Sequence, residues 1–591
     1  MPGKHLLLSA PTGSGKTLTA FLWAINQLAT GKWPVGETSV LYVSPLKALN
    51  NDIRTNLSEP PAEIRDCYTH EDRVFPEISV RTRSGDTPQA ERRRMVRRPP
   101  EILITTPETL NIILSSSSAR QILTTVRTAI LDEIHAVLQS KRGTHLITAV
   151  DRLTRPAGEF QRIGISATVK PMDLVAEFIG GYRRVGDGYE PRRVTPLAAP
   201  RDKRISLAVR FPVQPDGSPR TADGRSEPDV VWPSLVEELR TIIDRNRSTL
   251  IFVTTRRHAE KISELLNEDL DEPVAYAHRG SLSREIRSYV EQSLKAGRLR
   301  AIVATNSLEL GIDIGQLDEV VMVKTPMTVS STLQRVGRAG HQVDATSRGI
   351  LFPLYGREVV DAAVMARATL EQDIETSKPI VAPLDVLAQQ LVSMTAVEIW
   401  DIDELYAEIR CSWPYRSLER RRFDLVVEML AGRYAETRIR GLRPRVIVDR
   451  VDNTIKARDG SLAVLFQSGD TIPDRGYYGL QLAGDRSKVG ELDEEFVWER
   501  RVGDTFYLGS QLWTMTNITD RDVEVVPGTP GAHIIPFWKA EARGRGRHYS
   551  KLICEFLETC EEAIGRGSCG DARRPARSNR HSSPASTPRR L

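Results

Sequence analysis

Cysteine is scarce in this sequence, and the cysteines present form no motif. Five of the 591 residues are cysteines, an odd number spread over the chain: Cys67, Cys411, Cys554, Cys560 and Cys569. Because no two of them form a CxxC pair, the sequence offers neither a zinc ribbon nor a thiol–disulfide redox site. We therefore expect reduced thiols and a cytoplasmic protein.

Long apolar runs are also missing. No stretch approaches the ~18–20 apolar residues that a membrane-spanning helix needs. The short apolar run near the N-terminus is not followed by a signal-peptide cleavage site. With 40% hydrophobic and 27% charged residues, the composition is that of a globular protein, and the length predicts several domains, roughly four.

The net charge is small when the C-terminal residues 563–591 are counted separately from the rest of the chain. The formal charge is +5, but residues 563–591 contain seven arginines and one aspartate, which leaves −1 for the rest of the chain. A polyanion would therefore be bound by local basic patches and not by the overall field. Residues 563–591 are rich in Arg, Ser, Pro and Gly, and we expect them to be disordered. An out-of-frame or artificial chain end is the alternative.

The stretch Leu6–Thr17 reads LLLSAPTGSGKT, an apolar strand followed by a glycine-containing loop. Leu18–Leu28 follows with apolar residues at helical spacing, and this order indicates a phosphate-binding loop. Loop N–H groups and the helix N-terminus cradle phosphates, Lys16 adds a positive charge, and the Thr17 hydroxyl can ligate Mg²⁺. Ala10 replaces the first glycine of the general pattern, and an ordinary strand–turn–helix connection is the alternative. The expected nucleotide contacts are Thr12, Gly13, Ser14, Gly15, Lys16 and Thr17.

Thr128–His135, TAILDEIH, has the pattern of a buried strand that ends in two carboxylates. Ligands of open α/β sheets bind beyond the carboxyl ends of the strands, where Asp132 and Glu133 would emerge. Asp132 can hold Mg²⁺ through its water shell, and Glu133 can polarise the water that attacks a γ-phosphate. An Asp-Glu pair alone is compatible with a solvated turn. Together with the phosphate loop, it predicts the second half of one nucleotide site.

Short apolar strands alternate with helical segments through the first 350 residues, which predicts α/β domains with parallel sheets. Gly186–Pro233 interrupts this rhythm with Pro, Gly and Arg, apart from the strand-like run Ile205–Val213, and we expect an inter-domain linker there. The other expected strands are Val40–Ser44, Ile102–Thr106, Thr128–Leu131, Arg162–Ser166, Leu250–Thr254, Val274–Ala277, Ala301–Ala304, Glu319–Val323 and Gly349–Phe352.

The pattern changes after about Arg367. Three amphipathic segments separated by turn residues indicate a helix-turn-helix or winged-helix module. They are Leu384–Thr395, Ile402–Ile409 and Arg416–Ala431. The stretch from Leu442 to about Trp538 is β-like, with Asp-Gly and Pro-Gly turns and many aromatic residues.

Taken together, these motifs resemble superfamily 2 helicases, and closely the large helicase-related (Lhr) family, up to about residue 560. Single motifs of this length are weak signals, but eight in family order at helicase spacing are specific. Those resembling motifs Ia, Gly-Asp, Ib, DExH and III are Ser44–Leu49, Ser84–Asp86, Thr105–Glu108, Asp132–His135 and Ser166–Thr168. Those resembling motifs IV, V and VI are Phe252–Arg256, Ala304–Asp313 and Gln334–His341.

The resemblance implies an α/β fold of two tandem RecA-like parallel-sheet domains, followed by a winged-helix domain and a β-rich domain. The expected boundaries are 1–190 and 191–370 for the RecA-like domains, 371–435 for the winged helix, 436–562 for the β-rich domain and 563–591 for the basic tail. Family members carry, upstream of the phosphate loop, a segment whose Gln reads the adenine edge. The sequence begins at Met1, one strand before the loop, so we expect a fragment that lacks this segment and the long C-terminal extension of larger members.

The resemblance also implies ATP and Mg²⁺ as cofactors. It places Arg335 and Arg338 across an inter-domain cleft from the γ-phosphate, where they would act as arginine fingers, with more weight on Arg338. It adds His135 to the catalytic residues and Asp313 to the nucleotide contacts. His341 ends motif VI as in the Lhr family, whereas many superfamily members have Arg there. Surface salt bridges are the alternative role for the two arginines.

Motifs Ia, Ib, IV and V imply contacts with a phosphate backbone, which carries no sequence information. In the β-rich domain, TIPDRG and IPFWK match landmarks of the family and contain Ile472 and Trp538. An exposed Trp beside Lys539 can stack a base, and a core Trp is the alternative. For the basic run Arg92–Arg98 we favour a solvated helix face over a strand-binding patch. The backbone-contact candidates are Lys47, Thr106, Arg256 and Thr305.

The function implied by the resemblance is that of an ATP-dependent DNA helicase in DNA repair. Such an enzyme would move 3′-to-5′ on single-stranded DNA and unwind DNA or RNA:DNA duplexes. Its partners would be single-stranded DNA, 3′-tailed duplexes and RNA:DNA hybrids. Two alternatives stay open: an RNA helicase with a similar motor, and a truncated nucleic-acid clamp without efficient ATP hydrolysis.

Overall fold

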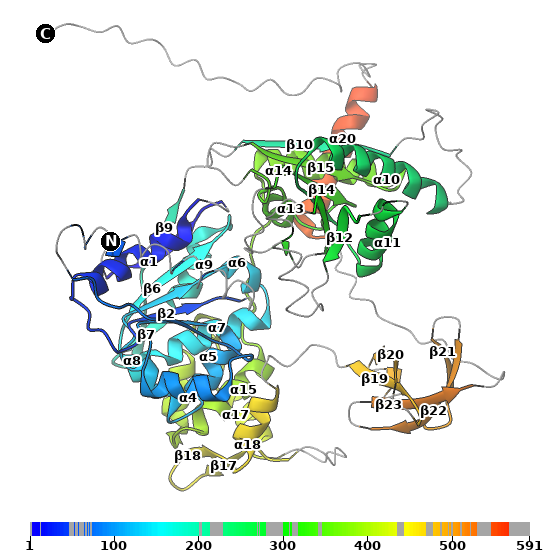
Figure 1. Cartoon of the computed structure of the whole chain (residues 1–591). Helices are drawn as coiled ribbons and strands as arrows, with labels where there is room; N and C mark the ends of the chain where they lie inside the picture. Colours follow the sequence, from blue (N-terminus) through cyan, green and yellow to red (C-terminus); the bar gives the residue numbers. More distant parts are fainter. Residues whose placement is uncertain are drawn as a thin grey trace, which may run out of the picture.

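The computed structural model arranges the chain around two parallel sheets, a three-stranded antiparallel sheet, a mixed five-stranded sheet and a two-stranded hairpin, with their covering helices (Figure 1). The described residues are 3–11, 14–45, 53, 57, 64–65, 68, 70, 74–199, 204–212, 228–268, 270, 272–278, 293, 299–305, 308–309, 317–340, 346–433, 443–468, 477–484, 487–493, 496–497, 500–508, 511–519, 522–528 and 545–565. None of the described helices is both long and apolar enough to cross a bilayer.

The first sheet has seven parallel strands in the order β3-β4-β2-β5-β6-β1-β9. The central strands β2, β4, β5 and β6 are buried along their whole length, as expected for a parallel sheet covered on both faces. The four strands predicted in this half of the chain agree with the structure to within one residue at each end. The strands are β1 (His5–Ser9), β2 (Val40–Val43), β3 (Val80–Arg83), β4 (Ile102–Thr105), β5 (Thr128–Leu131), β6 (Gln161–Ser166) and β9 (Val194–Ala198).

Alternate strand residues point to opposite faces of this sheet and meet different helices. Tyr42 and Ile163 pack with Phe21 of α1 on one face, whereas Leu103 and Leu131 pack with α5, α7 and α9 on the other. The helices are α1 (Lys16–Ala29), α4 (Gln89–Arg97), α5 (Pro107–Leu114), η1 (Ala119–Leu123), α6 (Ile134–Val137), α7 (Lys141–Arg152), α8 (Thr154–Ala157) and α9 (Met172–Gly180).

Gly186–Pro233 differs from the linker that its composition predicts. After the hairpin β7 (Tyr182–Val185) and β8 (Gly188–Pro191), β9 joins the first sheet beside β1. The first domain therefore extends beyond the expected boundary at residue 190. Hydrogen bonding along β1 and the packing of Val194 against the core outweigh the local Pro and Arg content.

The second sheet has six parallel strands in the order β10-β15-β14-β11-β13-β12. Helices α10 and α11 cover one face, and α13 and α14 cover the other. The strands are β10 (Ile205–Val209), β11 (Thr249–Phe252), β12 (Ala275–His278), β13 (Ala301–Ala304), β14 (Glu319–Val323) and β15 (Ser347–Phe352). The helices are α10 (Pro228–Arg245), α11 (Arg256–Asn267), α13 (Val329–Val336) and α14 (Gly356–Glu371).

The winged-helix module contains the three predicted helices: α15 (Leu384–Thr395), α16 (Ile402–Ile409) and α17 (Arg420–Leu430), with η3 (Trp413–Tyr415) between the last two. Its small antiparallel sheet contains Trp400–Asp401 (β16) at one edge and two strands from further along the chain, the first of which pairs with β16 and the second of which pairs only with the first. These strands, β18 (Thr454–Ala457) and β17 (Val446–Asp449), lie beyond the expected boundary at residue 435. Leu465 of α18 (Ser461–Ser468) packs on the same core, so the module continues well past the predicted end.

The β-rich region forms a five-stranded sheet in the order β20-β19-β23-β22-β21. Its strands are β19 (Tyr477–Leu482), β20 (Lys488–Asp493), β21 (Thr505–Leu508), β22 (Gln511–Ile518) and β23 (Asp522–Pro527). The last helix, α20 (Arg547–Gly565), does not belong to this sheet. Tyr549 and Ile553 of α20 pack into the core of the second α/β domain beside α14 (Figure 1). The region expected to be β-rich up to residue 562 therefore ends in a helix of another core.

The winged-helix module is joined to the first α/β domain by buried polar contacts. Arg152 Nη1 donates to Gln390 Oε1 at 2.7 Å, and Gln390 Nε2 donates to Asn111 Oδ1 at 2.9 Å. The Tyr182 N–H donates to the Cys411 carbonyl at 2.7 Å. Contacts of this kind, made by helices α5, α7 and α15, connect the two domains through directional bonds.

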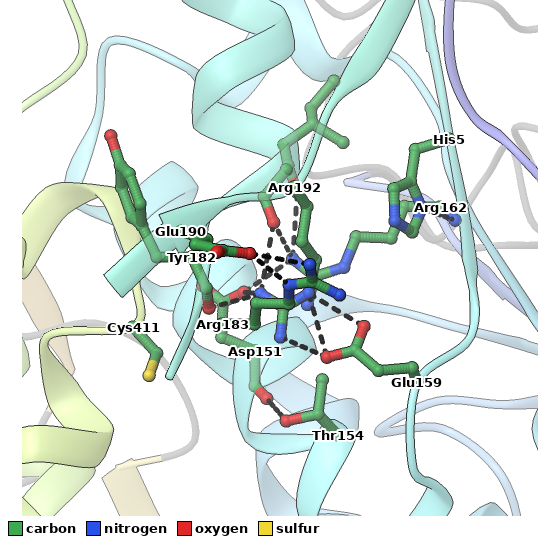
Figure 2. A network of polar contacts seen from close by, with 12 residues as sticks. His5, Asp151, Thr154, Glu159, Arg162, Tyr182, Arg183, Glu190, Arg192 and Cys411 are labelled. Atoms are coloured by element: carbon green, nitrogen blue, oxygen red, sulfur yellow. Dashed lines mark hydrogen bonds and ion pairs between the residues drawn. The ribbon is translucent and has the colours of Figure 1, made fainter. Parts of the chain in front are cut away.

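An ion cluster, named here the Arg162 cluster, lies at the amino-terminal edge of the first sheet (Figure 2). It comprises the buried residues Asp151, Arg162 and Arg192 and the half-exposed Glu159. The Arg162 side chain has no exposed surface and donates to Asp151 Oδ1 at 2.6 Å. Arg192 donates to Glu159 at 2.7 Å. The two carboxylates and two guanidinium groups balance one another in charge, and they tie α7 and β6 to the connection between β8 and β9.

Candidate nucleotide and strand site

The phosphate loop leaves the carboxyl end of β1, in the middle of the row β5-β6-β1-β9. Gly15, the residue before α1, has a φ of 75°, a conformation that glycine adopts without steric cost. Ser14 Oγ donates to the Pro11 carbonyl at 2.8 Å, and Lys16 Nζ lies 3.4 Å from the Ala10 carbonyl. Strand, loop and helix are thus arranged as predicted. Thr12 and Gly13 lie outside the described residues.

Asp132 and Glu133 follow β5 and are buried, with 2% and 5% of their surfaces exposed. Asp132 Oδ1 accepts the N–H of Glu133 at 2.7 Å, and its Oδ2 accepts a hydrogen bond from the Tyr42 hydroxyl. Burial and the neighbouring Glu133 raise the pKa of Asp132 to about 7. Glu133 has a left-handed backbone, with φ 47° and ψ 42°, a costly conformation for a non-glycine residue that is concentrated at functional sites.

His135 connects this pair to the segment after β6. Its Nδ1 accepts the N–H of Ala167 at 3.2 Å and lies 3.2 Å from Ser166 Oγ. Because a backbone N–H can only donate, Nδ1 carries no proton and the ring is the neutral Nε2–H tautomer. Burial lowers the pKa of His135, in agreement with a neutral ring. The 3.4 Å contact of Nδ1 with Glu133 Oε2 is therefore not an ion pair.

Arg335 and Arg338 lie on α13 and the turn after it, in the second domain. Arg335 donates to Glu309 Oε2 through Nε and Nη2 at 3.0 and 2.9 Å, and its guanidinium lies 4.9 Å from the centre of the Phe252 ring. Arg338 donates to the Glu309 carbonyl at 3.0 Å. The two arginines are 6% and 2% exposed, so the alternative of surface salt bridges is wrong.

Charges of both α/β domains act on Glu133. Burial acts to raise the pKa of this carboxyl, whereas the positive charges of Lys16 and Arg338 act to lower it. Arg338 is the contributor from the second domain. The cleft continues as a pocket lined by Pro11, Ala167 and Thr168 of the first domain and by Ser330, Leu333 and Gly337 of the second, among others. The phosphate loop, the DExH segment and the arginine turn therefore meet at one cleft.

The polar groups of this cleft fit a nucleoside triphosphate and an attacking water. Glu133 Oε2 and His135 Nε2 are buried and have no hydrogen-bond partner among the described residues. A buried polar atom in this state costs about 1–3 kcal/mol, which a ligand with complementary groups would remove. Lys16 and Arg338 are the cations at hand for phosphate oxygens.

A divalent cation would be held by few protein ligands. The described residues include no group of three or more His, Cys, Asp or Glu side chains arranged to hold a metal. Thr17 and Asp132 are the candidate ligands, and Mg²⁺ commonly takes its remaining ligands from phosphate and water oxygens.

The predicted strand contacts are only partly described. Thr106 is 1% exposed, and its hydroxyl caps α5 by accepting the N–H of Thr109 at 3.3 Å. A phosphate contact of this hydroxyl remains a prediction and would require the side chain to become accessible. Thr305 is half-buried at the end of β13, and Arg256 begins α11. The predicted positions outside the described residues are Lys47, Asp313, His341, Ile472 and Trp538.

The basic run Arg92–Arg98 lies on and just after α4, where Met95 is the buried residue. Arg92 donates to the carbonyls of Ser84 and Gly85 at 3.2 and 2.6 Å. The predicted solvated face thus also holds the loop of the Gly-Asp motif.

Two residues next to the site were not predicted from the sequence. Tyr42 lies in an apolar strand, where an aromatic residue usually fills a core, and its contact with Asp132 appears only because β2 neighbours β5. Glu309 lies inside motif V, so its position was indicated, but its ion pair with Arg335 requires the folded second domain.

Three family models match the chain: DEAD/DEAH box helicase at residues 1–175, helicase conserved C-terminal domain at 234–342, and the winged-helix domain of large helicase-related protein at 367–534. A Lhr helicase from Mycolicibacterium smegmatis is 41% identical over 595 residues, which cover 94% of this chain and 38% of the relative. The ATP-dependent helicase Lhr-Core of Methanothermobacter thermautotrophicus is 40% identical over 549 residues, 91% of this chain and 62% of the relative. The chain thus spans between about two fifths and three fifths of these relatives.

A solved structure of Mycobacterium smegmatis helicase Lhr bound to ssDNA and AMP-PNP is also similar. It superimposes with a TM-score of 0.75 at 39% identity and covers 95% of this chain and 68% of that one. Structures of the DUF1998 helicase MrfA share the fold at 20% identity, with a TM-score of 0.58. The order of the motifs, the winged-helix match and the cleft geometry agree with one another: the chain belongs to the large helicase-related family of superfamily 2 helicases.

Proposed function

We propose that this chain is an ATP-driven translocase that moves 3′-to-5′ along single-stranded DNA and unwinds DNA or RNA:DNA duplexes. The observation that carries the proposal is the cleft lined by both α/β domains, with Pro11 and Thr168 of the first and Leu333 and Gly337 of the second. A site built from both α/β domains hydrolyses nucleotide only when the domains close, which couples hydrolysis to movement.

Each task in ATP hydrolysis can be assigned to a residue in this cleft. Lys16 and the loop N–H groups would bind the β- and γ-phosphates, and Thr17 with Asp132 would hold Mg²⁺, which neutralises phosphate charge when bound. Glu133 would accept a proton from the attacking water, because its buried Oε2 has no hydrogen-bond partner among the described residues and is available to that water. The neutral His135 ring would orient a phosphate or water through Nε2–H. Arg338 would neutralise charge that develops in the transition state.

Binding of the nucleic-acid strand is proposed for the side of the two α/β domains that carries motifs Ia, Ib, IV and V. Lys47, Thr106, Arg256 and Thr305 remain the candidates for backbone contacts, with Ile472 and Trp538 as candidates for base contacts in the β-rich region. Support comes from the relative whose solved structure holds single-stranded DNA. Tailed duplexes, RNA:DNA hybrids and a place in DNA repair are proposed on the same basis.

Arg338→Ala tests the cross-cleft role. We expect kcat for strand-stimulated ATP hydrolysis to fall about 10³-fold or more, as on removal of an arginine finger, while affinity for an ATP analogue changes far less. Arg367→Ala is the matched control, because Arg367 is exposed and pairs only with Glu371 on α14 in the described structure. A normal kcat with weakened nucleotide binding would contradict the proposal.

Strand class and polarity need their own measurement. ATP turnover is compared with single-stranded DNA and RNA of equal length, and unwinding is compared on duplexes with 3′ or 5′ tails. The proposal expects DNA to stimulate hydrolysis and the 3′-tailed duplex to be unwound. Stronger stimulation by RNA would favour an RNA helicase, and binding without turnover would favour a clamp.

A further inference from the structure

The segment Asp373–Lys378 connects α14 to the winged-helix module and touches both α/β domains; it is named here the hinge strap. Ile374 is 3% exposed and belongs to the core of the second domain. Three residues later, Ser377 is buried against the first domain, where its N–H donates to the Lys170 carbonyl at 2.6 Å. Consecutive Cα atoms are 3.8 Å apart, so the two points of attachment to the two domains are at most about 11 Å apart along the backbone.

Within the hinge strap, Glu375 caps the helix that carries the arginines. Its Oε1 accepts the N–H of Val329, and its Oε2 accepts the N–H of Ser330 at 3.2 Å. The next N–H, of Ser331, donates to Thr328 Oγ1 at 3.2 Å. The first N–H groups of a helix have no partner inside it, and here the carboxylate satisfies two of them from outside α13.

The carboxylate also suits the electrostatics of α13. A negative charge at the amino end of a helix interacts favourably with its dipole, and charge-assisted hydrogen bonds to backbone N–H groups are stronger than neutral ones. α13 is short, eight residues, and Arg335 lies in its last turn. The position and tilt of α13 therefore depend strongly on how its first turn is held.

On the first domain, the hinge strap binds next to two catalytic segments. Lys170 follows Ser166–Thr168 by two residues, and its Nζ lies 3.3 Å from Asp373 Oδ1. The Lys378 N–H donates to Oε1 of Gln139, six residues after Glu133, at 3.3 Å. One segment thus touches the residues behind the catalytic carboxylate and the first turn of the arginine helix.

We propose that Glu375 is a positioning residue for the arginines of motif VI, acting through its cap on α13. The proposal rests on the proposed ATPase function of the cleft. Glu375 acts through the first turn of α13, and Arg338, in the turn that follows this helix, must reach the γ-phosphate when the domains close. Since the same segment is anchored beside Gln139 and Lys170, it sets the closed arrangement of the arginine turn relative to Glu133.

The test compares wild type, Glu375→Ala, Glu375→Gln and the control Glu371→Gln in the full chain. Glu371 lies four residues earlier, is exposed, and makes a surface pair with Arg367. Three measurements are made: steady-state ATP hydrolysis with single-stranded DNA, binding of a fluorescent non-hydrolysable ATP analogue, and thermal melting. A fourth, hydrogen exchange of the peptide 328–336, reports the cap without requiring activity.

We expect Glu375→Ala to lower kcat about tenfold, the factor that corresponds to loss of a helix cap. Glu375→Gln should lose less, because its amide oxygen can still accept one of the two N–H groups. Analogue affinity of the free protein should stay within about twofold, since the phosphate loop is untouched, and exchange in 328–336 should accelerate in both variants.

Two results would overturn the proposal: exchange and kcat equal to those of Glu371→Gln, or a lower melting temperature with parallel loss of analogue affinity. The second pattern would describe a merely structural residue. If wild type itself fails to hydrolyse ATP with any strand, the proposed function falls, whereas hydrogen exchange still shows whether Glu375 caps α13.

Discussion

Two buried carboxylate sites lie at opposite edges of the first sheet, and they are built on opposite principles. In the Arg162 cluster, Asp151 has an arginine partner at 2.6 Å from the neighbouring strand (Figure 2). In the cleft, Asp132 and Glu133 are buried to a similar degree. However, no described lysine or arginine lies within 4 Å of either carboxylate, and the His135 ring that contacts Glu133 at 3.4 Å is neutral.

The pKa directions express this difference. At Asp151, burial raises the pKa while Arg162 and Arg192 oppose the rise. At Asp132, burial and the second carboxylate both raise the pKa, to about 7. A buried carboxylate whose negative charge is left for a ligand to balance marks a functional site. A buried carboxylate whose charge is balanced by an arginine of the same chain has a structural role. The same sheet thus keeps its structural charges at one edge and its reactive charges at the other.

Among the variants that test this difference between the two sites, Glu133→Gln should have the largest effect. Because Gln keeps the shape and loses the base, we expect strand-stimulated ATP turnover to fall about 10²–10⁴-fold. Analogue binding and the melting temperature should change little. Turnover is measured by phosphate release, with Glu190→Gln as the control on an exposed pair. Persistent hydrolysis in Glu133→Gln would show that another group activates the water.

Asp151→Ala tests the opposite edge. Removal of one partner leaves the Arg162 guanidinium buried without its carboxylate, which typically costs ~3–5 kcal/mol of unfolding free energy. Denaturant unfolding followed by tryptophan fluorescence measures this cost. Glu190→Ala should cost no more than about 1 kcal/mol, because the Arg183–Glu190 side chains are more than half exposed. Equal losses in the two variants would refute the distinction between the edges.

The smallest effect is a pH dependence of stability without metal or nucleotide. Since the pKa of Asp132 is raised to about 7, the native state holds a proton that the unfolded state loses near pH 4. The unfolding free energy should therefore fall as pH rises from about 4 to 7, by at most ~1.4 kcal/mol per pH unit. Asp132→Asn should lack this contribution. Melting curves in a chelator check the difference, and identical pH slopes would contradict it.

Much of the fold could be predicted wherever the local sequence of a helix or strand is enough to identify it. α15 and α16 have their predicted bounds because each is amphipathic, and the Asp401 side chain caps α16. β9 could not be predicted, because its Pro196 and exposed residues argue against a strand and only β1 makes it one. The wing strands β17 and β18 and the helix α20 likewise depend on partners far away in the chain, which local patterns do not report.

The candidate site divides in the same way. Lys16, Asp132, Glu133 and the motif VI arginines could be located from spacing, since helicase motifs are contiguous. Contacts that join separate motifs could not: the Tyr42 hydroxyl on Asp132 and the Glu309 pair with Arg335 exist only after strands and loops are assembled. Glu375 belongs to no motif, and its role follows from where the chain crosses between domains.

Helix α20 gives the molecule a closed circuit of connections. The β-rich sheet is attached to the winged-helix module through the chain before β19, and α20 returns the chain to α14 of the second α/β domain. There His548 Nε2 lies 3.2 Å from Asp373 Oδ2 of the hinge strap. A rotation of the second α/β domain must therefore carry α20 with it, because Tyr549 and Ile553 are part of that domain's core. The same rotation would load the His548–Asp373 contact, which ties α20 to the segment between the two domains.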